Sequence, residues 1–352
     1  MKARIFIFLI ALAGLISCSK TPSPEKLPET VRENFRLIQK NPQFIMYINF
    51  EDMRKTDFWK IVINDSVIKA ESEFGGILDV FKKSTGASVS EGLDEFILAN
   101  SWDEKNTIIL RGTFNKDKLN EYIKTDSSYM TISSQNGTLV YVQKDKNLYF
   151  YLKENSLICA SNYLSRIEET LNATDTTKST LNDNPDMIKI IENTLYKNSI
   201  WLVTNQKTFI RLLLLNFSLG SKTPGTDSAN ITDSSYKIPQ DTAIQVNKNY
   251  FENVYQNINS FSLSTRMGND LQVAIQFEFT EEMKAEEFTK VLTGMIALSK
   301  LTAGAVQKDN PVQKVLDNIE IITNYNYSFL KAKITTDNVN EFRMLNLMQK
   351  PQ

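Results

Sequence analysis

The alternation of hydrophobic and polar positions predicts short strands separated by isolated helices. Residues 44–50 form the first continuous apolar run, and its length and aromatic content indicate a strand. Asn136-Gly137 lies between two further runs and is the pair most typical of a tight hairpin turn. The other predicted strands cover residues 95–102, 107–114, 129–134, 138–143, 149–152, 156–160, 200–204, 261–267, 271–279 and 320–334.

Helical spacing separates these strands. Apolar residues recur three and four positions apart between Val67 and Phe81 and predict a helix that ends near Gly86. Asn115 and Asn184 are placed to cap the helices that follow them. Further helices are expected over residues 31–39, 116–124, 163–171, 185–196, 209–219, 281–304 and 310–318, with a last short one after Asp337. Together these elements predict an α+β fold in which helices pack on antiparallel sheets.

The second half of the chain resembles part of the first. Residues 95–115 align without gaps with residues 260–280, at an offset of 165 positions. The alignment indicates two related halves built from a strand, strand, helix unit, or else two hairpins that are alike only in having aromatic ends. The matched pairs are Phe96 with Phe261, Leu98 with Leu263 and Phe114 with Phe279.

The organisation of the chain follows from these patterns. Residues 31–217 form a first α+β domain or half, and residues 250–352 form a second α+β half. Residues 218–249 between them are rich in Ser, Thr, Asp and Asn without a sustained apolar period, which is typical of a long loop or linker.

The first seventeen residues have the order of a secretory signal. Lys2 and Arg4 form a basic start, residues 5–12 are apolar, and the segment is followed by Cys18. Its apolar run is shorter than the roughly 20 residues that a membrane-spanning helix needs, which argues against an uncleaved anchor.

The end of this segment, Leu15-Ile16-Ser17-Cys18, resembles the lipobox of bacterial lipoproteins. The resemblance implies that a diacylglycerol is attached to the Cys18 thiol, that residues 1–17 are removed as a signal peptide, and that the new amino terminus is acylated. Several acyl chains would hold the protein stably on a membrane. The order of lipobox, tether and strand-and-helix body also resembles envelope lipoproteins of the Bacteroidota.

Residues 18–30 would then be the lipidated cysteine and a flexible tether. Pro22, Pro24 and Pro28 occur there among small and charged residues. The residue after the cysteine is Ser19, which by the same resemblance indicates the outer membrane. The tether lacks the acidic run of surface-exposed lipoproteins, so we expect the body to face the periplasm, with the cell surface as the alternative.

Composition excludes several classes of function. The 352 residues contain 40 Lys and Arg, 41 Asp and Glu and no histidine, for a formal charge of −1. Loss of residues 1–17 would change this charge to −3, so nucleic acid is not an expected partner. Without histidine, the Ser/His/Asp and Cys/His nucleophile systems and the HExxH zinc site are absent. The remaining cysteine, Cys159, lies in an apolar run and is expected to be a buried, inert thiol.

Other candidate sites have simpler structural explanations. Ser66 and Lys69 match the SxxK pattern of penicillin-interacting enzymes, but a chain rich in serine and lysine matches it by chance. The acidic residues at the start of the helix from 281 suit its positive end better than a metal. The oxygen-bearing residues near Asp337 lack the spacing of a calcium loop. Neither a metal nor a cofactor is expected. The other residues weighed here are Glu281, Glu282, Glu286, Glu287, Asn338, Asn340 and Glu341.

An aromatic row near the C-terminus could bind a sugar or pack under a helix. Tyr325, Tyr327 and Phe329 alternate and would share one face of a strand, where packing is the commoner role.

Three hypotheses of function follow. The first is a non-enzymatic, membrane-tethered binding or scaffold protein of the cell envelope, with an envelope protein docking on the sheet faces or on residues 218–249. The second is a carrier of lipid or another apolar ligand, with Phe209–Leu219 and the helix containing Met295 as pocket walls. The third is a histidine-free hydrolase, which would require a serine within reach of a buried lysine. The sequence leaves open whether the chain is an enzyme.

Overall fold

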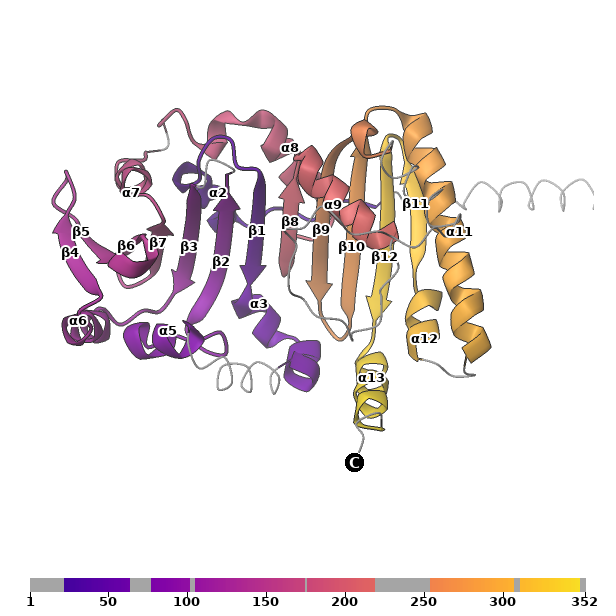
Figure 1. Ribbon diagram of the computed structural model, residues 1–352, viewed down its shortest axis with the longest axis horizontal. Helices are drawn as coiled ribbons and strands as arrows, with labels where there is room; N and C mark the ends of the chain where they lie inside the picture. The colour runs from indigo at the N-terminus through magenta and orange to yellow at the C-terminus, as the bar shows by residue number, and fades with distance from the viewer. Residues whose placement is uncertain are drawn as a thin grey trace, which may run out of the picture.

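The described part of the chain forms one long antiparallel sheet with helices on both faces (Figure 1). The computed structural model describes residues 22–63, 77–101, 105–174, 176–218, 254–306 and 311–348. This architecture confirms the predicted α+β class with antiparallel strands and packed helices. Within these ranges, no helix combines the length and apolar character needed to span a membrane.

Twelve strands build the sheet. They are β1 (Phe44–Asn49), β2 (Leu93–Asn100), β3 (Asn106–Gly112), β4 (Tyr129–Ser133), β5 (Leu139–Gln143), β6 (Leu148–Lys153), β7 (Leu157–Ser161), β8 (Ile200–Thr204), β9 (Ile258–Met267), β10 (Leu271–Phe279), β11 (Glu320–Asn324) and β12 (Tyr327–Ile334). Their order across the sheet is β11-β12-β10-β9-β8-β1-β2-β3-β7-β6-β5-β4.

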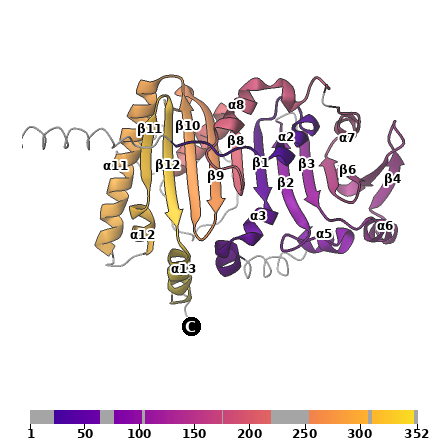
Figure 2. The ribbon, with the colours of Figure 1, turned by 180° about the vertical axis from the view of Figure 1, so that it is seen from behind.

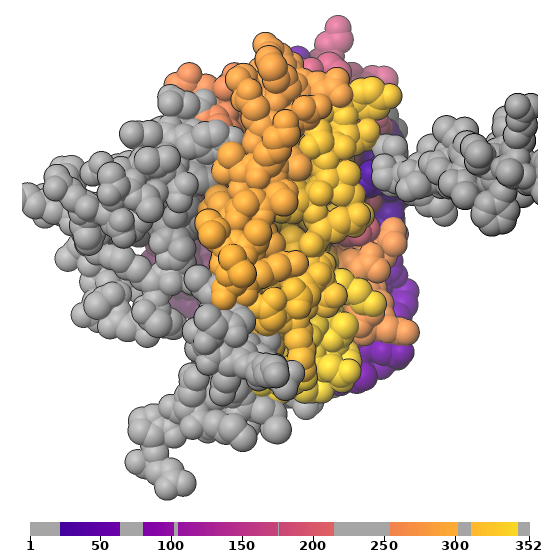
Figure 3. All heavy atoms as spheres, turned by 90° about the vertical axis from the view of Figure 1, so that its right-hand side faces the viewer, coloured from indigo at the N-terminus to yellow at the C-terminus, as the bar shows by residue number. Residues whose placement is uncertain are grey.

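Helices lie between and around these strands. They are α2 (Glu29–Asn34), α3 (Phe50–Lys55), α5 (Ile77–Thr85), α6 (Lys116–Thr125), α7 (Leu164–Leu171), α8 (Pro185–Asn193), α9 (Lys207–Ser218), α11 (Glu282–Val306), α12 (Pro311–Asp317) and α13 (Thr336–Met348). Short helical turns are η1 (Phe35–Leu37), η2 (Trp59–Ile63), η3 (Lys144–Lys146), η4 (Leu181–Asp183) and η5 (Tyr255–Asn257). Helix α11 and the strands after it form one end of the molecule (Figure 3).

The sheet separates two apolar cores because neighbouring residues of a strand point to opposite faces. In β1, Ile45 and Tyr47 are fully buried under α2, α7 and α8 (Figure 2), and we call this side the α8 face. The other side, which we call the α11 face, is covered by α5 and α6 over the first half of the sheet and by α9 and α11 over the second.

The strand order supports two related halves. The order β1-β2-β3-β7-β6 in the first half matches β8-β9-β10-β12-β11 in the second. In each half a hairpin is followed by a helix, α6 or α11, and a later hairpin returns beside the first one. Because β1 and β8 pair antiparallel at the centre, with Met46 opposite Leu202, the halves are arranged as if by a twofold axis through that pair. The first half has the additional hairpin β4–β5.

The register corrects the gapless alignment of the two halves. Phe96 lies opposite Leu110, whereas its counterpart Phe261 lies opposite Phe277. A constant offset of 165 would make Ile275 the counterpart of Leu110 and would place it opposite Phe261 instead. The second strands are therefore related by an offset of 167, because the second hairpin contains two more residues between equivalent positions.

Local signals placed several helix ends and turns correctly. The side chain of Asn115 accepts a hydrogen bond from Lys118 N, and that of Asn184 accepts one from Met187 N, so both are helix caps. Gly86 has φ +78° and Gly137 has φ +82°, backbone conformations that glycine adopts without strain. Helix α11 instead continues past the expected stop at residue 304 to Val306.

Candidate functional site

Several residues singled out in the sequence lie outside the described residues. Cys18 and the rest of the lipobox are among them, so lipidation remains a prediction from sequence. The SxxK serine Ser66 and residues 219–249 of the expected linker are also outside the described ranges.

The acidic candidates have structural roles. Glu287 pairs with Lys284 at 3.0 Å and Glu286 with Lys290 at 3.8 Å on the exposed side of α11. Thr335 caps α13 by accepting a hydrogen bond from Asn338 N at 3.2 Å, and the Asn338 side chain accepts one from Thr335 N at 3.0 Å, as in a capping box. Among the residues that the structure describes, no cluster of acidic or cysteine side chains is arranged to hold a metal ion.

The aromatic row is split between the core and the surface. Tyr327 and Phe329 stack with ring centroids 5.9 Å apart, and Phe329 is buried beside Leu195. Tyr325 is outside the strand, in the β11–β12 turn with φ +50°, and 74% exposed. Packing is thus the role of the strand residues, and the prediction that Tyr325 shares their face was wrong.

The helix expected to line an apolar pocket packs directly on the sheet. Ile210 and Leu214 of α9 and Phe288 of α11 are buried in one cluster with the aromatic residues of β9 and β10. Dense packing of this kind leaves these three side chains no apolar space for a ligand. The structure therefore favours the core role for α9 over the carrier hypothesis.

Lys197 is a buried lysine on the α8 face, and it holds the N-terminal segment. The residue is only 1% exposed, and its ammonium group donates hydrogen bonds to the main-chain oxygens of Glu25, Glu192 and Thr194 at 2.6–2.7 Å. Burial lowers the pKa of Lys197 to about 8, against the opposing effect of the two nearby carboxylates. All three acceptors are carbonyl oxygens, so these bonds do not form the Ser–Lys pair that a hydrolase would need.

The carboxylate of Glu25 completes this attachment. It accepts a hydrogen bond from the main-chain N of Lys197 at 2.6 Å and pairs with Arg266 of β9 at 2.5 Å. The guanidinium of Arg266 also lies 4.8 Å from the ring centroid of Tyr196. We call the contacts of Glu25 with Lys197 and Arg266 the tether clamp.

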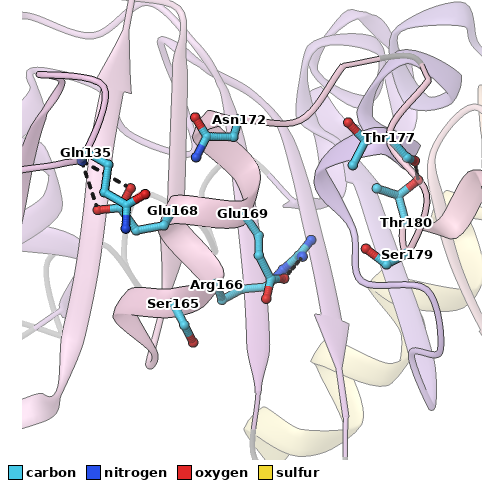
Figure 4. Close-up of a pocket in the computed structure, with 9 residues that line it drawn as sticks. All are labelled: Gln135, Ser165, Arg166, Glu168, Glu169, Asn172, Thr177, Ser179 and Thr180. Carbon is cyan, nitrogen blue, oxygen red and sulfur yellow. Dashed lines mark hydrogen bonds and ion pairs between the residues drawn. The ribbon is translucent and has the colours of Figure 1, made fainter.

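A polar groove lies on the first half of the molecule, beside α7. It consists of two hollows of about 460 and 390 Å³ that share Arg166 and Glu169. Figure 4 shows the residues of the first hollow. The residues lining the first hollow are Gln135, Ser165, Arg166, Glu168, Glu169, Asn172, Thr177, Ser179 and Thr180. Those lining the second are Gln39, Lys40, Asn41, Gln43, Ser101, Lys105, Arg166 and Glu169. We call the two together the α7 groove.

The base of the groove is a network of buried polar groups. The guanidinium of Arg166 donates to Thr107 Oγ1 at 3.1 Å, to the main-chain oxygen of Leu37, and to Glu169 Oε2 at 2.6 Å. Gln39 accepts a hydrogen bond from Thr107 and donates to Ser101 Oγ at 3.1 Å. Because these side chains satisfy one another, they are rigid and hold the exposed groups above them in place.

The wall between the hollows is built from two loops far apart in sequence. Gln39 and Thr180 form an isolated antiparallel bridge, and Lys40 N donates to Ser179 O at 3.1 Å. Ser179 has φ +79°, a conformation that is strained for a residue other than glycine. Backbone strain of this kind concentrates at functional positions.

Charge is unevenly distributed along the groove. The buried Arg166 is paired with Glu169, which is exposed. Glu168 is the other acid of the first hollow and accepts a weak 3.4 Å hydrogen bond from Gln135 N. Lys40 and Lys105 line the second hollow. The groove is thus acidic at one end and basic at the other.

The sequence offered no signal for this groove. Its residues come from the loop between η1 and β1, the β2–β3 turn, the β4–β5 turn, α7 and the segment between α7 and η4, which the fold brings together. The nearest signal in the sequence was the position of Arg166. Its spacing from Ile167 and Thr170 puts it on the buried face of the short helix α7, where an arginine is unusual.

Comparisons with known proteins are distant. No protein-family model matches the chain, and no curated protein matches it. Among solved structures, crystal form III of TP0453 is similar at 10% identity over 87% of this chain and 96% of that chain, with a TM-score of 0.45. Crystal form I of TP0453 is similar at 9% identity over 87% of this chain and 94% of that chain, with a TM-score of 0.44.

Proposed function

We propose that this chain is a lipid-anchored protein of the cell envelope that binds a partner without catalysing a reaction. The lipobox-like residues ending in Cys18 support the anchor, and the α7 groove supplies a binding surface. The observation that carries the proposal is the tether clamp, which fastens the chain just after the expected anchor to the folded body.

The clamp would keep the anchor close to one end of the molecule. Residues 18 to 22 span at most about 14 Å when fully extended. The N-terminal segment crosses the α8 face from α2 toward β12 (Figure 2). The second half of the sheet, with α11, would therefore lie next to the bilayer.

The groove would lie far from that end. Seven strand spacings separate β12 from β7, the strand next to α7, which corresponds to about 34 Å along the sheet at about 4.8 Å per spacing. A partner bound there would be held at a defined distance from the membrane. This geometry suits a scaffold. We infer a position on the periplasmic side of the outer membrane from Ser19 after the expected lipidated cysteine and from a tether without an acidic run.

Fractionation of the Cys18→Ala variant tests the anchor. We expect the variant to fold and to leave the membrane fraction, while the matched Cys159→Ala variant stays in it. Persistence of Cys18→Ala in the membrane pellet after an alkaline wash would contradict the proposal.

Native mass spectrometry of the full-length protein, extracted from its own membranes in mild detergent, tests the binding role. A stoichiometric second polypeptide or peptide is the expected result. A bound lipid-sized mass beyond the acyl groups on Cys18 would instead favour a carrier.

A further inference from the structure

We propose that the α7 groove binds an extended peptide that carries one positively and one negatively charged group. The inference rests on the proposed binding function and adds the class of ligand. It follows from three properties of the groove: its polar lining, its separation of charge and its shape.

The lining excludes other ligand classes. The residues lining both hollows are polar, with amide, hydroxyl, carboxylate, guanidinium and ammonium groups, and no aromatic or aliphatic side chain is among them. An apolar ligand would cover these polar and charged groups without giving them hydrogen-bond partners, which costs free energy. A glycan usually stacks on an aromatic ring, and a nucleic acid requires a uniformly basic surface. Peptide groups, in contrast, pair with amide and hydroxyl side chains.

The charges identify which side chains the peptide would carry. Arg166 and Glu169 neutralise each other where the hollows meet, which leaves Glu168 at one end and Lys40 at the other. An ammonium or guanidinium group of the ligand would bind beside Glu168. A carboxylate would bind beside Lys40 in the second hollow, which Lys105 also lines.

The shape favours an extended ligand. The two hollows, of about 460 and 390 Å³, share Arg166 and Glu169, so an extended ligand that crosses this ion pair can reach into both. The rigid network around Arg166 and the strained Ser179 hold the walls before a ligand arrives, which lowers the entropy cost of binding.

The test measures binding of capped peptides with lysine and aspartate separated by one to four alanines. Fluorescence anisotropy with the full-length protein in detergent would follow labelled peptides, with the Gln and Asn counterparts as neutral controls. We expect one spacing to bind about tenfold or more tightly than its neutral counterpart, and this difference to shrink with added salt.

Charge variants of the protein locate the binding site. Glu168→Gln should weaken binding of peptides that contain lysine and leave the Gln/Asp peptide unchanged, whereas Lys40→Gln should do the reverse for aspartate. The matched controls are Glu154→Gln, in the exposed β6–β7 turn, and Lys153→Gln, at the exposed end of β6, and they should change neither.

Three outcomes would overturn the inference: equal binding of the neutral peptides, no binding at any spacing, or binding of a neutral oligosaccharide that competes with the peptides. None of them alters the membrane fractionation of Cys18→Ala, so failure of this inference is distinguishable from failure of the proposed anchor.

Discussion

The ammonium nitrogen of Lys197 lies 2.6 Å from the main-chain oxygen of Glu25, a residue 172 positions earlier in the chain. A lysine ammonium has three protons, and the other two are donated to the carbonyls of Glu192 and Thr194. Full satisfaction of its donors explains how a buried charge is tolerated here. The same three bonds join the N-terminal segment to the end of α8.

Replacing Lys197 with methionine should release this segment. The amide of Glu25 donates to Leu195 O at 2.8 Å, and we expect its hydrogen exchange to become about tenfold faster or more in Lys197→Met. Lys55→Met is the matched control, because that ammonium pairs with Glu51 and both side chains are more than half exposed, so the pair contributes little. Unchanged exchange at Glu25 in Lys197→Met would show that other contacts hold the segment.

The free energy of unfolding should depend on pH in a way that reflects the lowered pKa of Lys197. Its pKa is about 8 in the folded protein and about 10.4 in an unfolded chain, so between these values the unfolded state binds more protons. The free energy of unfolding should therefore rise from about pH 8 to about pH 10. Urea unfolding should detect this rise in the wild type, and Lys197→Met should lack it.

Buried tyrosines should reverse the trend at higher pH. Burial raises the pKa of Tyr47, Tyr151 and Tyr327 above the usual value of 10.0. The folded state then keeps protons that the unfolded state loses, and stability falls above about pH 10. Continued stabilisation at about pH 11 in the same unfolding series would contradict this assignment.

Trp201 should be a major contributor to stability at the centre of the sheet. It is 1% exposed and stacks on Tyr47 across the β1–β8 pair, with centroids 5.5 Å apart. Trp201→Ala is expected to lower the free energy of unfolding by about 3–5 kcal/mol. Its indole nitrogen has no partner within the described structure, so Trp201→Phe should cost less, about 1.5 kcal/mol. Equal losses in the two variants, measured by urea unfolding, would mean that the indole nitrogen contributes.

Cys159 should react only when the protein unfolds. Its side chain is fully buried in β7, and burial raises the pKa of its thiol, which keeps it protonated. In the Cys18→Ala variant, iodoacetamide should label it only at urea concentrations that unfold the chain. A cysteine introduced at the exposed Ser127 serves as the reactive control. Rapid labelling of folded Cys159 would reveal local opening of β7.

The fold was predictable where interactions within one short segment determine its structure. Asn115 and Asn184 cap their helices because a side-chain oxygen reaches a main-chain amide three residues later, and that distance is local. The register of the second hairpin was not predictable, because pairing Phe261 with Phe277 depends on the number of residues in its turn.

The groove and the clamp depend on contacts between distant segments. Arg166 and Lys197 are both buried, although charged residues are normally expected at the surface. Their acceptors are mainly main-chain oxygens, which leave no trace in the sequence pattern. The anchor, by contrast, was predicted from four adjacent residues ending in Cys18.

The order of the strands has a mechanical consequence. Tension between the anchored end and a partner held at α7 would pass across the sheet, through each ladder in turn, so the weakest ladder limits the load. The two ladders that flank β8 and the β3–β7 ladder contain five residue pairs each, whereas β10 and β12 share eight. Under force, the molecule should therefore part first at one of these three short ladders, and two of them meet at β8, at the boundary between its two halves.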